Sequence, residues 1–107
     1  MKWQNKVQLV GYLGKDPLVR ILPSGYFYAV LRVATNNGYT KEGKERVTAW
    51  HTVKYWGKKA SYIQNCFMKG SHVLVDGTIQ YHTYTNKEGQ TRQSTEIKAS
   101  LLLNLDR

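Results

Sequence analysis

A two-residue alternation of apolar and other side chains runs through most of this 107-residue sequence, and it restricts the chain to folds built from β-strands. In the segment 7–13, Val7, Leu9, Gly11 and Leu13 fall on one side. Further segments of strand-forming composition lie at residues 19–22, 26–35, 46–56, 72–80 and 91–105. The sequence therefore predicts a mostly β protein.

One interval departs from this alternation. Between Gly57 and Gly70, the apolar residues Ala60, Ile63 and Phe67 recur at spacings of three and four, which places them on one face of a helix. Gly70 is the expected terminator of that helix. The chain is thus expected to be all-β apart from one helix.

The order of the elements predicts the architecture. If residues 7–13 and 19–22 form one bent strand, the chain has five strands with the helix between the third and the fourth, which is the order of a five-stranded OB-fold barrel. A split β-sandwich is the alternative, but it leaves the helix without a place. The length of 107 residues fits a single domain over 1–107.

Two loops should project from this domain. The Asn-Lys-Glu-Gly turn at residues 86–89 predicts a long hairpin between the fourth and fifth strands. Residues 36–44 contain two glycines and charges of both signs, so we expect a long exposed loop with Tyr39 near its middle.

The charge balance points to a polyanionic partner. Sixteen Lys and Arg residues against seven Asp and Glu give a net charge of +9, and the self-repulsion of such a charge opposes folding. Nucleic acid is the commonest partner for such a surface. An anionic membrane, an acidic protein and a surface that serves solubility alone are the competing interpretations.

The cysteine count, the opening residues and the length of the apolar runs bear on where the protein is found. The single cysteine, Cys66, cannot form an internal disulfide, which favours a reducing compartment. The opening residues are polar and no secretory signal follows. The longest apolar run, residues 26–31, is far shorter than the roughly 20 residues that span a bilayer. We therefore expect a cytoplasmic protein without membrane association.

The segment 49–56 carries the strongest functional signal. One face of this strand should present Trp50, Thr52, Lys54 and Trp56, and the other Ala49, His51, Val53 and Tyr55. A core would have to bury Lys54 at high cost, whereas indoles around a lysine suit the stacking of bases and contact with phosphates. The alternative is that one Trp belongs to the core and the other to its rim.

Other residues extend this candidate site. Tyr39 and Tyr84 lie in loops with lysines nearby and are further candidates for base stacking. Lys58 and Lys59 at the expected helix start oppose the helix dipole and should attract an anion. The full set of candidate phosphate contacts is Lys6, Lys41, Lys54, Lys58, Lys59, Lys69, Lys87 and Arg92.

Enzymatic chemistry is not indicated. The three histidines are 21 and 10 residues apart and lack the cysteine or carboxylate neighbours of a zinc site, so no metal ligands are assigned. Phosphate-binding glycine loops, dinucleotide fingerprints and nucleophile elbows do not occur. We expect a protein that is not an enzyme and needs no cofactor.

Several short motifs occur in the order and spacing of one known family. They are Asn5-Lys6-Val7, Leu9-Val10-Gly11, Asp16-Pro17, Trp50-His51, Trp56-Gly57-Lys58, Lys69-Gly70-Ser71 and Val75-Asp76-Gly77. Through them the chain resembles the bacterial single-stranded DNA-binding proteins from Asn5 to about Leu105. The resemblance implies sequence-tolerant binding and protection of single-stranded DNA in replication, recombination or repair.

The resemblance also implies roles for individual residues. Trp50 matches a base-stacking Trp of the family, and Trp56, Tyr39 and Tyr84 occupy positions where the family has other aromatic residues. His51 matches a histidine at a subunit interface, so a homotetramer is expected.

The sequence departs from the family in three places. Tyr81-His82-Thr83 lacks the basic residues often found there, and Thr52 stands where the family often has Arg. The acidic tail through which the family recruits replication and repair proteins is not seen before the end at Arg107. A dimeric primosomal replication protein, acting as an interaction module, and an RNA-binding chaperone are the alternatives.

Overall fold

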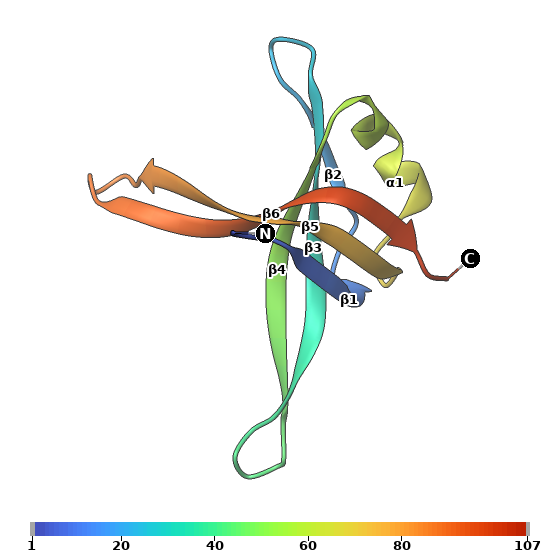
Figure 1. Cartoon of the computed structure of the whole chain (residues 1–107), viewed down its shortest axis with the longest axis vertical. Coiled ribbons are helices and arrows are strands. Elements are labelled where there is room, and N and C mark those ends of the chain that lie inside the picture. Colours follow the sequence, from blue (N-terminus) through green and yellow to red (C-terminus); the bar gives the residue numbers. More distant parts are fainter. Residues whose placement is uncertain (1, 107) are drawn as a thin grey trace.

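Strands form most of the chain in a computed structural model that describes residues 2–106. The elements, in order, are β1 (Val7–Leu13), β2 (Leu18–Ile21), β3 (Phe27–Tyr39), β4 (Arg46–Trp56), the 3-10 helix η1 (Lys58–Tyr62), α1 (Ile63–Cys66), β5 (His72–Thr85) and β6 (Thr91–Asn104) (Figure 1). The prediction of a mostly β chain with one short helical region before the last two strands is confirmed.

The strand pairings close into a ring. The sheet order is β1-β5-β6-β4-β3-β2, and β1 also pairs with β3 through Tyr12 and Leu13. The pair of β4 and β6 is parallel and joins Val53 to Ile97. All other pairs are antiparallel, and β2 lies outside the ring on the free edge of β3.

The structure has six strands where we expected five. The expected bent strand is divided at residues 14–17 into β1 and β2, which have different partners: β1 pairs with β5 and β3, and β2 with β3 alone. Pro17 lacks a backbone N–H for a sheet hydrogen bond, so the division falls where the sequence is least able to continue a strand.

The core lies inside the ring and follows the predicted alternation. Its fully buried members include Leu31, Val33, Val53, Val73 and Val75. The predicted helical face, Ala60, Ile63 and Phe67, is buried in the same cluster.

The helical region itself differs from the prediction. It consists of a five-residue 3-10 helix and a single α-helical turn, and it ends at Cys66 rather than at Gly70. Phe67 is already extended, and Gly70 adopts a φ of 90° in the turn that leads to β5. Within residues 2–106, no helix is long and apolar enough to cross a membrane.

Two hairpins extend beyond the ring as arms. The β3–β4 arm points down in Figure 1 and the β5–β6 arm points to the left. The exposed loop expected at 36–44 is shorter than predicted. β3 continues to Tyr39, which pairs with Arg46, so the loop covers residues 40–45 and Tyr39 precedes it. An irregularity between Asn36 and Tyr39, with Gly38 at a φ of 101°, lets the strand bend there without ending. β5 likewise runs to Thr85 instead of ending at Gln80.

The alternation of buried and exposed side chains along β4 can be tested through stability. We expect Val53→Ala to lower the free energy of unfolding by about 1 to 3 kcal/mol, because the side chain is fully buried and its removal leaves a cavity. Urea denaturation measures this. Val47→Ala is the matched control on an exposed part of the same strand and should change stability by less than about 0.5 kcal/mol. Equal effects of the two variants would contradict the placement of Val53.

Candidate nucleic-acid interface

The outward face of β4 carries the residues that the sequence placed there. Trp50 is 51% exposed, while Val53 on the opposite face is fully buried. Thr52, Lys54 and Trp56 share the side of Trp50 by alternation and are partly exposed. Neither Trp belongs to the buried core, so the alternative of one core indole is wrong.

Strand β3 adds two residues to this face. Its register sets Tyr28 opposite Trp56 and Arg32 opposite Thr52. Neither residue was predicted from the sequence, although they alternate with the apolar Ala29 and Leu31, which are buried in the structure. We call the set Tyr28, Arg32, Trp50, Thr52, Lys54 and Trp56 the β3–β4 platform.

Arg32 organises one end of the platform. Its Nη1 donates a hydrogen bond to Thr52 Oγ1 at 2.6 Å, and its guanidinium carbon lies 6.0 Å from the centre of the Trp50 ring. The same indole covers Gly14, where an added Cβ would collide with the ring. Arg32 thus places a positive charge directly beside Thr52.

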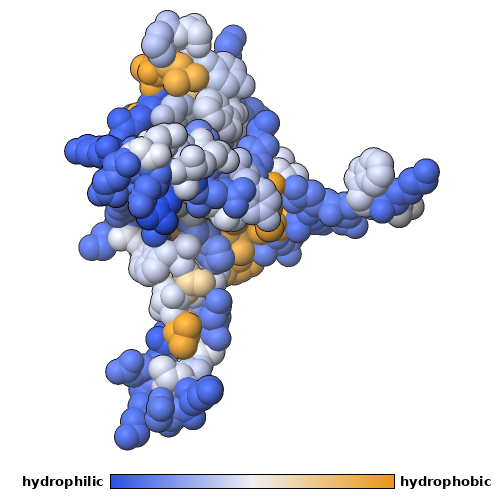
Figure 2. Space-filling view, turned by 90° about the vertical axis from the view of Figure 1, so that its left-hand side faces the viewer, coloured by the Kyte–Doolittle hydropathy of each residue, from blue (hydrophilic) through white to orange (hydrophobic). Residues whose placement is uncertain are grey.

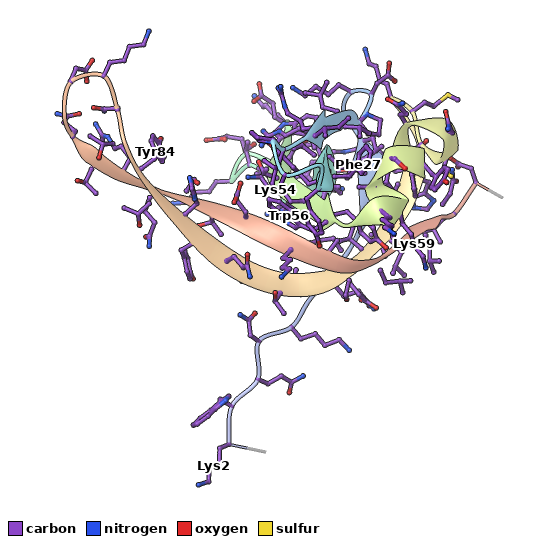
Figure 3. All side chains as sticks on the ribbon, turned by 90° about the horizontal axis from the view of Figure 1, so that it is seen from above. Lys2, Phe27, Lys54, Trp56, Lys59 and Tyr84 are labelled. Carbon is purple, nitrogen blue, oxygen red and sulfur yellow. The ribbon has the colours of Figure 1, made fainter. Side chains whose placement is uncertain are left out.

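Aromatic rings and a lysine make up the other end. The rings of Tyr28 and Trp56 stack with their centres 4.6 Å apart and their planes at 24°. Lys54 Nζ lies 5.7 Å from the centre of the Tyr28 ring, within the range of a cation–π contact. Figure 3 shows Lys54 and Trp56 near the middle of the molecule.

Lys54 already has an ionic partner. Its Nζ lies 2.8 Å from Oε2 of Glu96, and the two side chains are 25% and 18% exposed. This is the one salt bridge among the described residues, and its acidic partner was not predicted from the sequence. A phosphate that contacts Lys54 must therefore compete with Glu96 or share the lysine with it.

The two other candidate tyrosines lie away from the platform. Tyr39 ends β3 on one arm, near Lys41, and Tyr84 is near the end of β5 on the other, with Lys87 and Arg92 following. All five are exposed. In Figure 3 Tyr84 stands far out on its arm, and Figure 2 shows the lower arm covered chiefly by hydrophilic residues.

Contrary to the prediction from the sequence, Lys58 and Lys59 do not lie at the start of a regular α-helix. They lie in a five-residue 3-10 helix that cannot supply a sizeable helix dipole, and they line different surface hollows. Lys59 lines a hollow with Tyr55 and Leu102, and Lys58 lines one beside Tyr26. The remaining candidates, Lys6 before β1 and Lys69 after α1, are exposed.

His51 lies partly buried on the inward side of β4. Its Nε2 and Thr35 Oγ1 are 2.9 Å apart and share a hydrogen bond. Burial, and then the charge of Arg32, lower the pKa of His51 below its ordinary value. The imidazole is therefore neutral at neutral pH. Protonating it in mild acid opposes folding, because the unfolded state binds that proton more readily.

The platform can stack planar rings and pair with anions. Comparison with protein families matches residues 4–105 to the Single-strand binding protein family. The chain belongs to this family. A relative, "Single-stranded DNA-binding protein 1" of Xylella fastidiosa (strain 9a5c), is 37% identical over 98 residues, which cover 89% of this chain and 72% of the relative. In residues 2–106 no group of three or more His, Cys, Asp or Glu is placed to hold a metal ion.

The Lys54–Glu96 pair can be tested through salt dependence. We expect Glu96→Gln to bind oligothymidylate more tightly and to steepen the slope of log K against log salt by up to about 0.7, because Lys54 becomes free for one more phosphate. Filter binding across a salt series measures both quantities. Glu42→Gln, which makes the same change in net charge on an exposed loop, is the control. A parallel response of the two variants would mean that only the net charge matters.

Proposed function

We propose that this protein binds single-stranded DNA with little sequence preference and protects it during replication, recombination or repair. One observation carries the proposal: the β3–β4 platform presents two partly exposed indoles, a stacked tyrosine and two cations on one outward face. Every base offers a π-face, so stacking on such a surface tolerates any sequence. Membership of the single-strand binding family supports the same conclusion.

We further propose that the ring of strands is an OB-fold barrel formed by a single domain over residues 1–107. The closed ring of pairings and the helical segment between β4 and β5 support this assignment. With β1 and β2 taken together, the order of elements is that of the five-stranded barrel. In that fold the outer surface of the sheet commonly receives the nucleic acid, and here it carries the platform.

We infer that base stacking and phosphate contact are carried by different residues. Successive groups of bases stack on Trp50 and Trp56. The phosphates that link these bases are attracted by Arg32, Lys54, Lys58 and Lys69. On the arms, Tyr39 with Lys41, and Tyr84 with Lys87 and Arg92, extend the path beyond the platform. Lys6 and Lys59 complete the set of cations that we assign to phosphate. None of these steps makes or breaks a covalent bond or requires a cofactor.

The decisive experiment follows quenching of Trp fluorescence by oligothymidylate, with duplex DNA and RNA as competitors. We expect tight binding of the single strand, and we expect Trp50→Ala and Trp56→Ala each to weaken it by about 1 to 3 kcal/mol while the fold is retained. Trp3→Ala is the control, because Trp3 is 84% exposed in a segment that extends away from the strands (Figure 3).

Other outcomes would identify the alternatives. A preference for duplex DNA, or no quenching, would contradict the proposal. A preference for RNA would favour the RNA chaperone, and weak DNA binding by a dimer that captures a replication protein would favour the primosomal module.

We also propose a homotetramer in the cytoplasm, with replication or repair proteins as further partners. An apolar sheet face supports the assembly: Val10, Tyr12, Leu101 and Leu103 on β1 and β6 are 41% to 55% exposed. β5 joins these strands by pairing Leu74 with both Val10 and Leu103. Burial of such a face is favourable and most readily satisfied by a second copy.

Light scattering at micromolar concentration tests the assembly. We expect a tetramer for the wild type and a smaller species for Leu103→Asp, because a carboxylate on this sheet face cannot be buried cheaply. His51→Lys should loosen the assembly in the same way if His51 lies at a subunit contact. A wild-type monomer would contradict the proposal.

A further inference from the structure

A surface hollow adjoins the β3–β4 platform at the end of β4. It lies between the turn that joins β2 to β3 and the 3-10 helix η1, and its volume is about 630 Å³. Small-molecule sites commonly measure about 300 to 1,000 Å³. Its chief lining residues are Leu22, Tyr26, Phe27, Lys58, Ser61 and Tyr62, and we call it the turn hollow.

The turn hollow continues the stack of the platform. The centre of the Tyr26 ring lies 6.0 Å from that of Trp56, with the planes at 26°. Trp56 in turn stacks on Tyr28. One wall of the hollow therefore belongs to the same group of near-parallel rings on which the bases are proposed to lie.

Backbone hydrogen bonds hold both sides of the hollow. Leu22 and Tyr26 close the turn, with the Leu22 N–H donating to the Tyr26 carbonyl at 2.9 Å. The N–H of Gly57, just before η1, donates to the Phe27 carbonyl at 2.9 Å and fixes the helix beside β3. The walls are thus positioned before any ligand arrives, which lowers the entropic cost of binding.

The lining fits one chemical class. Leu22 and Phe27 are partly buried and apolar, whereas Tyr26 and Tyr62 are 50% and 65% exposed. Such exposed rings suit a planar aromatic ligand. Lys58, also exposed, adds a positive charge at the edge. A nucleotide combines a planar base with an adjacent anion and satisfies both features.

We propose that the turn hollow is a nucleobase-binding subsite of the single-stranded DNA path, in which a base beyond Trp56 lies against Tyr26 and Tyr62 and its phosphate contacts Lys58. This inference rests on the proposed function and deepens it. It extends the path by at least one nucleotide past the end of β4, toward the turn and the helix. It also separates the phosphate contacts of two neighbouring lysines, because Lys59 lines a different hollow.

An abasic scan tests the subsite. Oligothymidylates with a single abasic residue at each position, including both ends, are titrated against the full-length wild type, Tyr62→Ala and Lys58→Gln. With the wild type, loss of the base that occupies the hollow should weaken binding by about 5- to 150-fold, the equivalent of 1 to 3 kcal/mol. With Tyr62→Ala the same abasic position should cost much less, since the base and the ring act as a pair.

Two controls separate this proposal from the proposed function. Lys59→Gln makes the same change in charge as Lys58→Gln, but Lys59 lines a different hollow, so this variant should keep the full abasic effect at the turn hollow. Trp50→Ala should bind more weakly but keep the abasic effect at the hollow. If Trp50→Ala weakens binding and no abasic position distinguishes Tyr62→Ala from the wild type, the subsite is wrong and the proposed function stands. If the wild type binds no oligothymidylate, both are wrong.

Photo-crosslinking gives an independent measurement. Oligonucleotides that carry 5-iodouracil at single positions should crosslink to Tyr26 or Tyr62, as mapped by mass spectrometry. Crosslinks confined to Trp50, Trp56 and the arms would overturn the subsite.

Discussion

The close passage of β1 across β3 is the constraint on which the ring of strands depends. β1 pairs with β5 from Val7 to Tyr12 and transfers to β3 at Tyr12 and Leu13. An added Cβ at Gly11 would collide with the carbonyl of Ala34, so only glycine permits this approach. Without the transfer the sheet would remain open, and the inward faces of β3, β4 and β5 would have no common core to surround.

Closure of the ring also creates the platform. Because Val53 and its neighbours point inward, the alternate residues of β3 and β4 must point outward. The large aromatic rings among them are therefore not buried by other parts of the chain. They cover one another in part, as Tyr28 and Trp56 do. The Lys54–Glu96 pair lies among them, so charge on this surface is partly balanced before a ligand arrives.

The sequence predicted the strands, the bounds of β4 and its buried and exposed faces, because alternation reports burial directly. The turn at residues 86–89 predicted the projecting β5–β6 hairpin. The sequence did not predict that β3 extends into an arm or that β5 stays regular past Gln80, since Asn36, Gly38 and the polar residues after Gln80 carry no apolar pattern. There, cross-strand pairing and not burial sustains the strand.

Contacts between segments that are distant along the chain could not be predicted from the sequence either. Tyr28 and Arg32 were identifiable as outward residues of β3, but their partners depend on register with β4. Glu96 meets Lys54 only because β6 runs parallel to β4 across the closure of the ring. Lys58 and Lys59 line different hollows on the short 3-10 helix, which the spacing of Ala60, Ile63 and Phe67 did not distinguish from a regular helix.

The arms have a further consequence for local stability. Their side chains are almost all exposed, so their backbone hydrogen bonds have little packed behind them and should open at a lower free energy than those of the ring. The molecule therefore combines a rigid centre with two compliant extensions. On the proposed path, single-stranded DNA would meet a fixed surface at the platform and a more easily opened extension at each arm.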